Sequence, residues 1–360
     1  MTRRESPRLS RGRGSVQPLY CRRCRDGGGS GEGAGWQAGN AGAHEARKGR
    51  WHMRRITGVA VGLLASLLAA AAAEPAAATS YAAGKWLAVA DYSQGKVCLV
   101  GPDGTVRFET PAPSCDDLWA LENGNLLFNT GRGVREVTRA GVTVFEYTSS
   151  SEVYACQRLA NGNTFVGECN SGRLLEIKPD GSVAKEVRLL PEGQDGGHAY
   201  MRNARQLANG HYLVALTGSQ LVREIDGDGK TVWEVAAPSG PHSLARLANG
   251  NTLIATGDLA QDPRLLEVDA AGKTVWEVSN RDLPGAPLRF LTGFQRLPNG
   301  NTLISNWLGH NEFGKAPHLL EITPDKKVVW TYENHKDFKT IASVVVLDAD
   351  GKAPGGAIIH

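Results

Sequence analysis

Short apolar runs alternate with polar turns from residue 84 to residue 350, and the alternation repeats. One phrase, Leu-x-Asn-Gly-Asn-Thr-Leu or a close variant, recurs around five glycines: Gly124, Gly162, Gly210, Gly250 and Gly300. A weaker copy surrounds Gly84. A second phrase follows each first one and contains Asp-Gly or a variant before a β-branched run, as in residues 265–276. Asn-Gly or Asp-Gly between apolar runs predicts a two-residue type I′ hairpin, whose central residues both need positive φ. Each repeat therefore predicts two tight hairpins and four short strands.

The repeat length selects the architecture. The hairpin glycines are spaced by 40, 38, 48, 40 and 50 residues, and four strands in such a repeat are typical of a β-propeller blade. The array begins with the second strand of a blade, residues 86–90, and a lone apolar strand, residues 343–347, remains near the C-terminus. We therefore expect an all-β fold, a six-bladed β-propeller of four-stranded blades. Its ring is closed by pairing of the C-terminal strand with the N-terminal blade, which leaves no exposed edge there.

The first 78 residues have a different pattern. Residues 1–52 are rich in Arg and Gly without apolar periodicity, so we expect a disordered extension. Residues 53–78 begin with Met53-Arg54-Arg55, continue with an apolar run and end in small residues, which predicts a signal peptide. Translation starting at Met53 would make residues 1–52 a gene-model artefact. We expect an exported protein, periplasmic or secreted, whose propeller spans residues 79–360; the segment is a membrane anchor only if it is not cleaved.

Charge is distributed unevenly and limits the partners. Residues 1–55 hold 13 basic and 4 acidic side chains, whereas the rest of the chain holds 27 basic and 33 acidic ones. A nucleic-acid surface needs clustered Lys and Arg, so no nucleic acid is expected on the propeller. We expect a monomer whose partner is a small polar or aromatic ligand, or a protein.

One face of the propeller is the candidate site. The hairpin turns are short, so length variation falls in the loops between second and third strands and between blades, which emerge on the same face. Loops on a rigid scaffold carry function. The side chains expected there to bind a ligand are Asp91, Asp116, Asn129, Tyr154, Glu168, His198, His242, Asp258, Asn306, His310 and His335, with Asp117, Asn170 and Trp307 beside them. This mixture suits a small polar or aromatic ligand. No metal motif is present and no cofactor is expected, although carboxylates would suit calcium.

Four cysteines remain after the signal segment. A two-residue hairpin at Asn161-Gly162 places Cys156 opposite residue 167, so that Cys169 is its diagonal neighbour on the same side, and an exported protein can oxidise such a pair. A Cys156–Cys169 disulfide is therefore a candidate, with strained geometry. Cys98 stands where other repeats have Leu, so we expect it to be a buried apolar residue.

The Leu-x-Asn-Gly-Asn-Thr-Leu and Gly-Lys-Thr-Val-Trp phrases make residues 84–350 resemble the quinoprotein-like (PQQ-like repeat) and arylsulfotransferase-like propellers of bacteria. Residues 334–344 resemble the closing stretch of exported propellers. The quinone-dependent dehydrogenases of this superfamily usually have eight blades and an adjacent Cys-Cys pair, whereas this chain has room for six blades and has no such pair.

The arylsulfotransferases have six blades and pass sulfate through a histidine, and His242 occupies a similar place. Leu244 stands where that family has Asn, and no Arg follows at residues 256–258. The first expectation is therefore a binding or interaction module. The alternative is a divergent arylsulfotransferase-like group-transfer enzyme with His242 as its catalytic residue.

Overall fold

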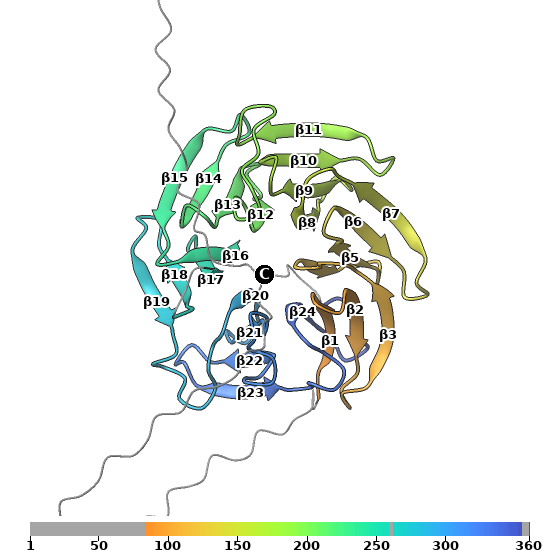
Figure 1. Cartoon of the computed structure of the whole chain (residues 1–360), viewed down its shortest axis with the longest axis vertical. Helices are drawn as coiled ribbons and strands as arrows, with labels where there is room; N and C mark the ends of the chain where they lie inside the picture. The colour runs from red at the N-terminus through yellow and green to blue at the C-terminus, as the bar shows by residue number, and fades with distance from the viewer. Residues whose placement is uncertain (1–83, 259–261, 355–359) are drawn as a thin grey trace, which may run out of the picture. The chain divides into compact units, whose positions relative to one another are not determined.

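In the described part of the chain, twenty-four strands form six four-stranded antiparallel sheets around a central channel (Figure 1). The structure, a computed structural model, describes residues 84–258, 262–354 and 360. No helix in these residues is long and apolar enough to cross a membrane. The predicted six-bladed propeller is confirmed. The predicted extension, residues 1–52, and the predicted signal peptide, residues 53–78, lie outside the described residues.

We number the blades in chain order and give the strands from the channel outward. Blade 1 is β24 (Ile341–Leu347), β1 (Trp86–Asp91), β2 (Lys96–Val100) and β3 (Val106–Pro111). Blade 2 is β4 (Leu118–Ala120), β5 (Leu126–Asn129), β6 (Gly133–Val137) and β7 (Thr143–Thr148). Blade 3 is β8 (Val153–Arg158), β9 (Thr164–Glu168), β10 (Arg173–Ile177) and β11 (Val183–Arg188). Blade 4 is β12 (Asn203–Gln206), β13 (Tyr212–Leu216), β14 (Leu221–Ile225) and β15 (Thr231–Ala236). Blade 5 is β16 (Gly240–Arg246), β17 (Thr252–Asp258), β18 (Leu265–Val268) and β19 (Thr274–Val278). Blade 6 is β20 (Leu291–Arg296), β21 (Thr302–Asn306), β22 (Leu319–Ile322) and β23 (Val328–Tyr332).

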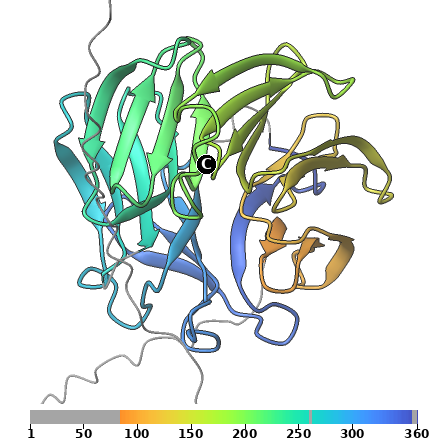
Figure 2. The ribbon, with the colours of Figure 1, turned by 45° about the horizontal axis from the view of Figure 1, so that its top comes forward.

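Blade 1 closes the ring. β24 pairs antiparallel with β1, from Trp86 opposite Leu347 to Ala90 opposite Ser343, which is the pairing expected from strand counting. In Figure 2 the blue β24 lies beside the orange strands of the same blade. The two ends of the array therefore share one sheet, and the inner edge of β1 is paired with β24.

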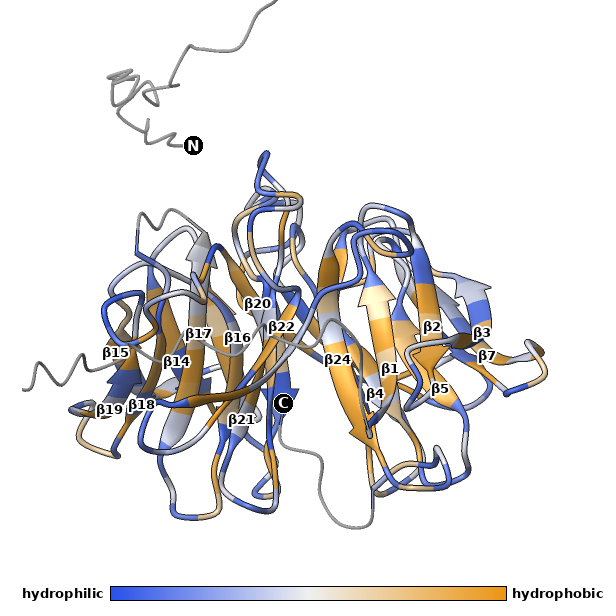
Figure 3. Ribbon diagram, turned by 90° about the horizontal axis from the view of Figure 1, so that it is seen from below, coloured by the Kyte–Doolittle hydropathy of each residue, from blue (hydrophilic) through white to orange (hydrophobic). Residues whose placement is uncertain are grey.

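The apolar core lies between the blades. The buried hydrophobic residues form six clusters in the described part of the chain, and each joins two neighbouring blades. Between blades 6 and 1, for example, Leu303 and Tyr332 pack with Leu87 and Val344. Figure 3 shows apolar residues along the strands and polar residues at the turns. The seam at which the ring closes is thus packed like the other five.

The hairpins differ from the predicted two-residue turns. In blade 3 the Leu159 N–H donates to Asn163 O at 2.9 Å and the Gly162 N–H donates to Leu159 O at 3.0 Å. Gly162 has φ 85°, whereas Asn161 is not among the residues with positive φ. This is a type I turn followed by a glycine bulge, which needs only one left-handed residue. The prediction of type I′ turns was wrong, since only the glycine of the turn has positive φ. The Asn side chain forms hydrogen bonds instead.

The recurring Asn side chains bind the recurring Glu of the third strand. In blade 3, Asn161 Nδ2 and Asn163 Nδ2 donate to Glu176 Oε1 at 2.7 and 2.6 Å. In blade 2 the corresponding carboxylate, Glu136, also forms an ion pair with Arg158 of the next blade. The repeated phrases therefore hold each turn to the third strand of its own blade and, in blade 2, to the next blade. Their recurrence reflects a structural role.

Candidate functional site

One repeat position supplies the side chains at the channel mouth. It lies eight residues before each hairpin glycine, Gly351 included, and it is occupied by Asp116, Tyr154, Arg202, His242, Thr292 and Ser343. In blades 3, 5 and 6 this residue is bulged out of the strand pairing, which passes directly from Val153 to Ala155, from Pro241 to Ser243 and from Leu291 to Gly293. A bulge interrupts the alternation of a strand and redirects a side chain. We call these six residues the upper ring.

Four members of the upper ring line one cavity of about 200 Å³, the loop-face cavity. They are Asp116, Arg202, His242 and Thr292, and loop residues complete the lining: Tyr92, His198, Phe290, Trp307 and His310. The loops belong to the two variable classes predicted to form the functional face. The cavity therefore collects side chains from blades 1, 2, 4, 5 and 6.

Aromatic rings form one wall of the loop-face cavity. The ring of Trp307 lies 5.1 Å from Phe290, 4.9 Å from His310 and 6.0 Å from Tyr92, centroid to centroid, all edge to face. Phe290 also meets the ring of His242 at 5.2 Å. Gly257 makes room for this wall, because a Cβ there would lie 2.5 Å from the Phe290 ring. Edge-to-face pairs hold rings in fixed orientations, so this wall is preorganised.

Charged and polar groups complete the lining of the cavity. The guanidinium of Arg202 lies 4.4 Å from the ring centroid of Tyr154 and contacts His198 Nε2 at 2.5 Å. His198 Nδ1 lies 2.7 Å from Glu152 Oε2. A guanidinium can only donate, so Nε2 accepts and the proton of the imidazole lies on Nδ1, which donates to Glu152. Burial raises the pKa of Tyr154, which keeps its phenol protonated. Arg202, which is 8% exposed, is thus the fixed cation of the cavity.

Three other predicted site residues, which are not in the described lining of this cavity, anchor loops. Asn306 Oδ1 accepts from Arg289 N at 2.7 Å, and its Nδ2 donates to Pro287 O and Pro317 O at 3.1 and 3.0 Å. Asn129 holds the main chain around Asp116 in the same way. Asp91 accepts from Lys339 N at 2.6 Å. All three anchors are fully buried. Their hydrogen bonds to main-chain groups hold the loops around the cavity residues in place.

Glu168, His335 and Asp258 were also predicted to bind the ligand. Glu168 is fully buried and bonded to Arg173 at 2.7 Å and to two serine hydroxyls. Its burial opposes ionisation, but these hydrogen bonds hold its pKa below the ordinary value. His335 packs on His318 at 4.4 Å, away from the cavity lining. The side chain of Asp258 lies outside the described residues.

The four cysteines within the described residues are free thiols and buried, so the candidate Cys156–Cys169 disulfide is not formed in the structure. The glycine-bulge turn shifts the register and places Cys156 opposite Val166 instead of residue 167. Cys156 contacts Asp117 O, whereas Cys169 contacts His198 O at 3.2 Å. The two thiols therefore point to different neighbours. Cys98 is fully buried, as predicted, and burial raises its pKa to about 12.

Sequence reasoning missed Arg202, Thr292, Tyr92 and Phe290 as cavity residues. For Arg202 and Thr292 a signal was present, because both occupy the repeat position of Asp116 and His242. Tyr92 and Phe290 lie in loops of variable length, where the repeat gives no register. No three His, Cys, Asp or Glu side chains gather as a metal ion would require in residues 84–258, 262–354 and 360.

Comparison with known proteins supports the fold and assigns no activity. No protein-family model and no curated protein matches the chain. Among solved structures, the chain is similar to a protein of unknown function from Bacteroides caccae, with 28% identity and a TM-score of 0.66, over 73% of this chain and 99% of that one. It is more distantly similar to virginiamycin B lyase from Staphylococcus aureus, with 17% identity and a TM-score of 0.48, over 71% and 86% of the two chains. A streptogramin B lyase gives 16% and 0.49, over 73% and 90%.

Proposed function

We propose that this chain is an exported β-propeller that binds a small ligand, bearing an aromatic and a polar group, in the loop-face cavity. The observation that carries the proposal is the convergence of side chains from five blades on one cavity of about 200 Å³. Aromatic rings line it together with the polar side chains of Arg202, His198 and Asp116. Ligand sites combine apolar surface with a few placed polar groups. Export rests on the signal-peptide pattern of residues 53–78.

The test is ligand binding with and without one upper-ring side chain. Aromatic carboxylic acids, phenols and aryl sulfates would be screened by thermal shift, and hits measured by isothermal titration calorimetry. His242→Ala should weaken a hit at least about tenfold, roughly 1.4 kcal/mol, and leave the fold intact. His211→Ala is the matched control, because His211 lies in a hairpin turn and is bonded to Glu224 at 2.7 Å. Equal affinities in the parent and His242→Ala would reject this cavity as the site.

A second candidate is sulfuryl transfer through His242, in line with the resemblance to arylsulfotransferases. Arg202 from the neighbouring blade lines the same cavity as His242, which supplies a cation that residues 256–258, at the end of β17, lack. An imidazole nitrogen would attack the sulfur of an aryl sulfate and release the phenolate, and an acceptor phenol would then take the sulfuryl group and restore the imidazole. Incubation with 4-nitrophenyl sulfate and phenol, followed by intact mass measurement, should reveal a sulfo-histidine. Absence of nitrophenolate release and of the adduct would exclude this activity for that donor.

A further inference from the structure

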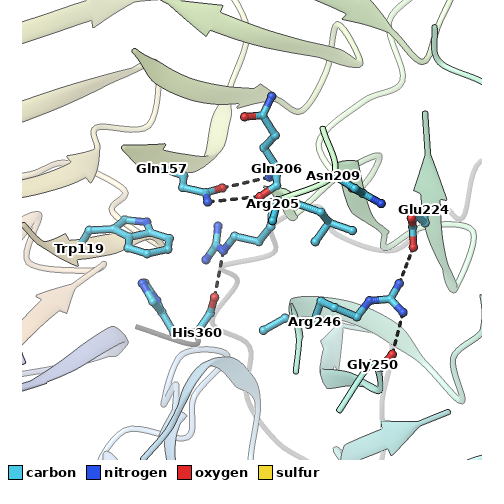
Figure 4. Close-up of a pocket in the computed structure, with 12 residues that line it drawn as sticks. Trp119, Gln157, Arg205, Gln206, Asn209, Glu224, Arg246, Gly250 and His360 are labelled. Atoms are coloured by element: carbon cyan, nitrogen blue, oxygen red, sulfur yellow. Dashed lines mark hydrogen bonds and ion pairs between the residues drawn. The ribbon is translucent and has the colours of Figure 1, made fainter. Parts of the chain in front are cut away.

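A second ring of side chains lies at the other end of the channel. It is formed by the residues five positions before each hairpin glycine, and we call it the lower ring: Trp119, Gln157, Arg205, Ala245, Gln295 and Val346. Its first four members line a cavity of about 570 Å³, which we call the turn-face cavity. Figure 4 shows Trp119 and Arg205 in this cavity facing His360, far from both residues in sequence.

Arg205 fixes the floor of the turn-face cavity. Its two terminal nitrogens bind Asp117 at 2.7 and 2.9 Å, and the pair is buried. The Nε–H points elsewhere and donates to the main-chain oxygen of His360 at 3.0 Å. The guanidinium also lies 5.2 Å from the ring of Trp119. One fixed donor beside one aromatic face is a recognition element for an acyl oxygen next to a flat ring.

His360 fills this element incompletely. Its ring lies 4.0 Å from that of Trp119, centroid to centroid, and the residue is 5% exposed. Its Nε2 is buried without a hydrogen-bond partner among the described residues. Burial, and then the charge of Arg205, hold its pKa well below the ordinary value. The imidazole therefore stabilises the fold through its contact with Trp119, whereas its unbonded Nε2 costs desolvation free energy.

We propose that the turn-face cavity is a second ligand site, which takes an uncharged flat ring adjacent to an acyl oxygen, and that His360 occupies it as a replaceable internal ligand. A phenyl ring makes the contact with Trp119 without burying an unsatisfied nitrogen. The rest of the lining is mixed: Leu207, Ala208 and Ala245 are apolar, whereas Asn209 and Arg246, which is paired to Glu224 at 2.6 Å, are polar. The volume of about 570 Å³ leaves room for further atoms beside the ring, as in a small aromatic amide or an aromatic residue at the end of a peptide.

The primary variant is His360→Gly in the full chain, which removes the ring and keeps the backbone. The probe is N-acetyl-L-phenylalanine, measured by isothermal titration calorimetry, with N-acetyl-L-alanine as the control without a ring. We expect His360→Gly to bind the phenylalanine probe at least tenfold more tightly than the parent does and not to bind the alanine probe. Trp119→Leu in the His360→Gly background should abolish the binding. A companion variant, His360→Phe, should melt above the parent.

Three outcomes would overturn the proposal. They are no binding by a folded His360→Gly protein, equal affinity in parent and variant, or binding that survives Trp119→Leu. If His360→Gly does not fold, a melting temperature of His360→Phe at or below that of the parent refutes the inference by itself. His242→Ala should not alter this binding, which separates the site from the loop-face cavity. If His360→Gly binds the peptide Gly-Gly-Ala-Ile-Ile-Phe more tightly than N-acetyl-L-phenylalanine, the result would support a peptide as the ligand. Equal affinities would support a small aromatic amide.

Discussion

The ion pair between Arg205 and Asp117 joins three blades, so we expect the whole propeller to depend on it. Asp117 stands just before β4 of blade 2, Arg205 lies on β12 of blade 4, and Cys156 N on β8 of blade 3 donates to the same carboxylate at 2.8 Å. The side chains of the ion pair are 6% and 1% exposed. Asp117→Asn keeps the size of the side chain and an acceptor for Cys156 N, but leaves the guanidinium buried without a counter-charge.

Removing one partner of a buried pair costs about 3–5 kcal/mol. The lower end applies here, because Arg205 keeps two main-chain acceptors, Ala204 O and His360 O. For a domain of this size about 3 kcal/mol corresponds to a fall in Tm of roughly 6 °C or more. The assay is scanning calorimetry together with urea unfolding followed by tryptophan fluorescence.

Two further variants make the Asp117→Asn result specific. Glu146→Gln breaks the exposed pair with Arg135, whose side chains are 27% and 52% exposed, and should cost less than about 1 kcal/mol. The double variant Asp117→Asn with Arg205→Gln removes the stranded charge, so its loss of stability should be smaller than the sum of the single losses. A loss below about 1 kcal/mol for Asp117→Asn, or additive losses in the double variant, would refute the reasoning.

Three other predictions follow from the seam, from a buried histidine and from a loop anchor. Deleting residues 341–360 should lower the Tm of the whole propeller, because β1 loses its inner partner, whereas deleting residues 1–52 should not change it; a Tm within about two degrees of the parent after the first deletion would contradict closure. Burial and the neighbouring His335 lower the pKa of His318 to about 4, below the ordinary 6.5. The unfolded chain therefore binds the proton first, and the free energy of unfolding should fall by about 3 kcal/mol as pH drops from 6.5 to 4. Urea unfolding at several pH values should show that this free energy depends less on pH in His318→Asn than in the parent. The same pH dependence in both proteins would contradict this. Asn306→Ala should cost about 2 kcal/mol in urea unfolding and also weaken ligand binding in calorimetry, because the loop that carries Phe290 loses its anchor; unchanged affinity would mean that the anchor does not position the cavity.

Much of the fold could be predicted because it is encoded locally and repeatedly. The glycine of each turn and the apolar runs beside it specify a hairpin without reference to the rest of the chain, and strand counting then gave the pairing of residues 86–90 with residues 343–347. The turn type was not specified by the Asn-Gly pair alone. Asn161 does not adopt positive φ, and its side chain binds Glu176 on the third strand, a contact that lies outside the turn itself.

The candidate site could be predicted only as a face of the propeller. Asp116, His198, His242 and His310 were expected on that face and do meet in one cavity. Asn129, Asn306 and Asp91 share its chemistry, but their hydrogen bonds go to main-chain groups of neighbouring loops. Position along a strand does not specify what a polar atom bonds to, so sequence cannot separate a ligand-facing amide from a loop anchor. The contact of Arg205 with His360, 155 residues away, has no local signal at all.

The shared sheet of blade 1 also sets an order in which the molecule can fold. Blades 2 to 6 are each built from one continuous stretch of chain, so their strands meet through short loops. Blade 1 must bring residue 86 to residue 347, and such long-range pairing is slow because the entropy of closing the loop is lost before the contact forms. The inner edge of β1 stays open until that moment and offers unpaired N–H and C=O groups to other chains. We therefore expect the closing of this one strand pair to limit the rate of folding and to be the step with which aggregation competes.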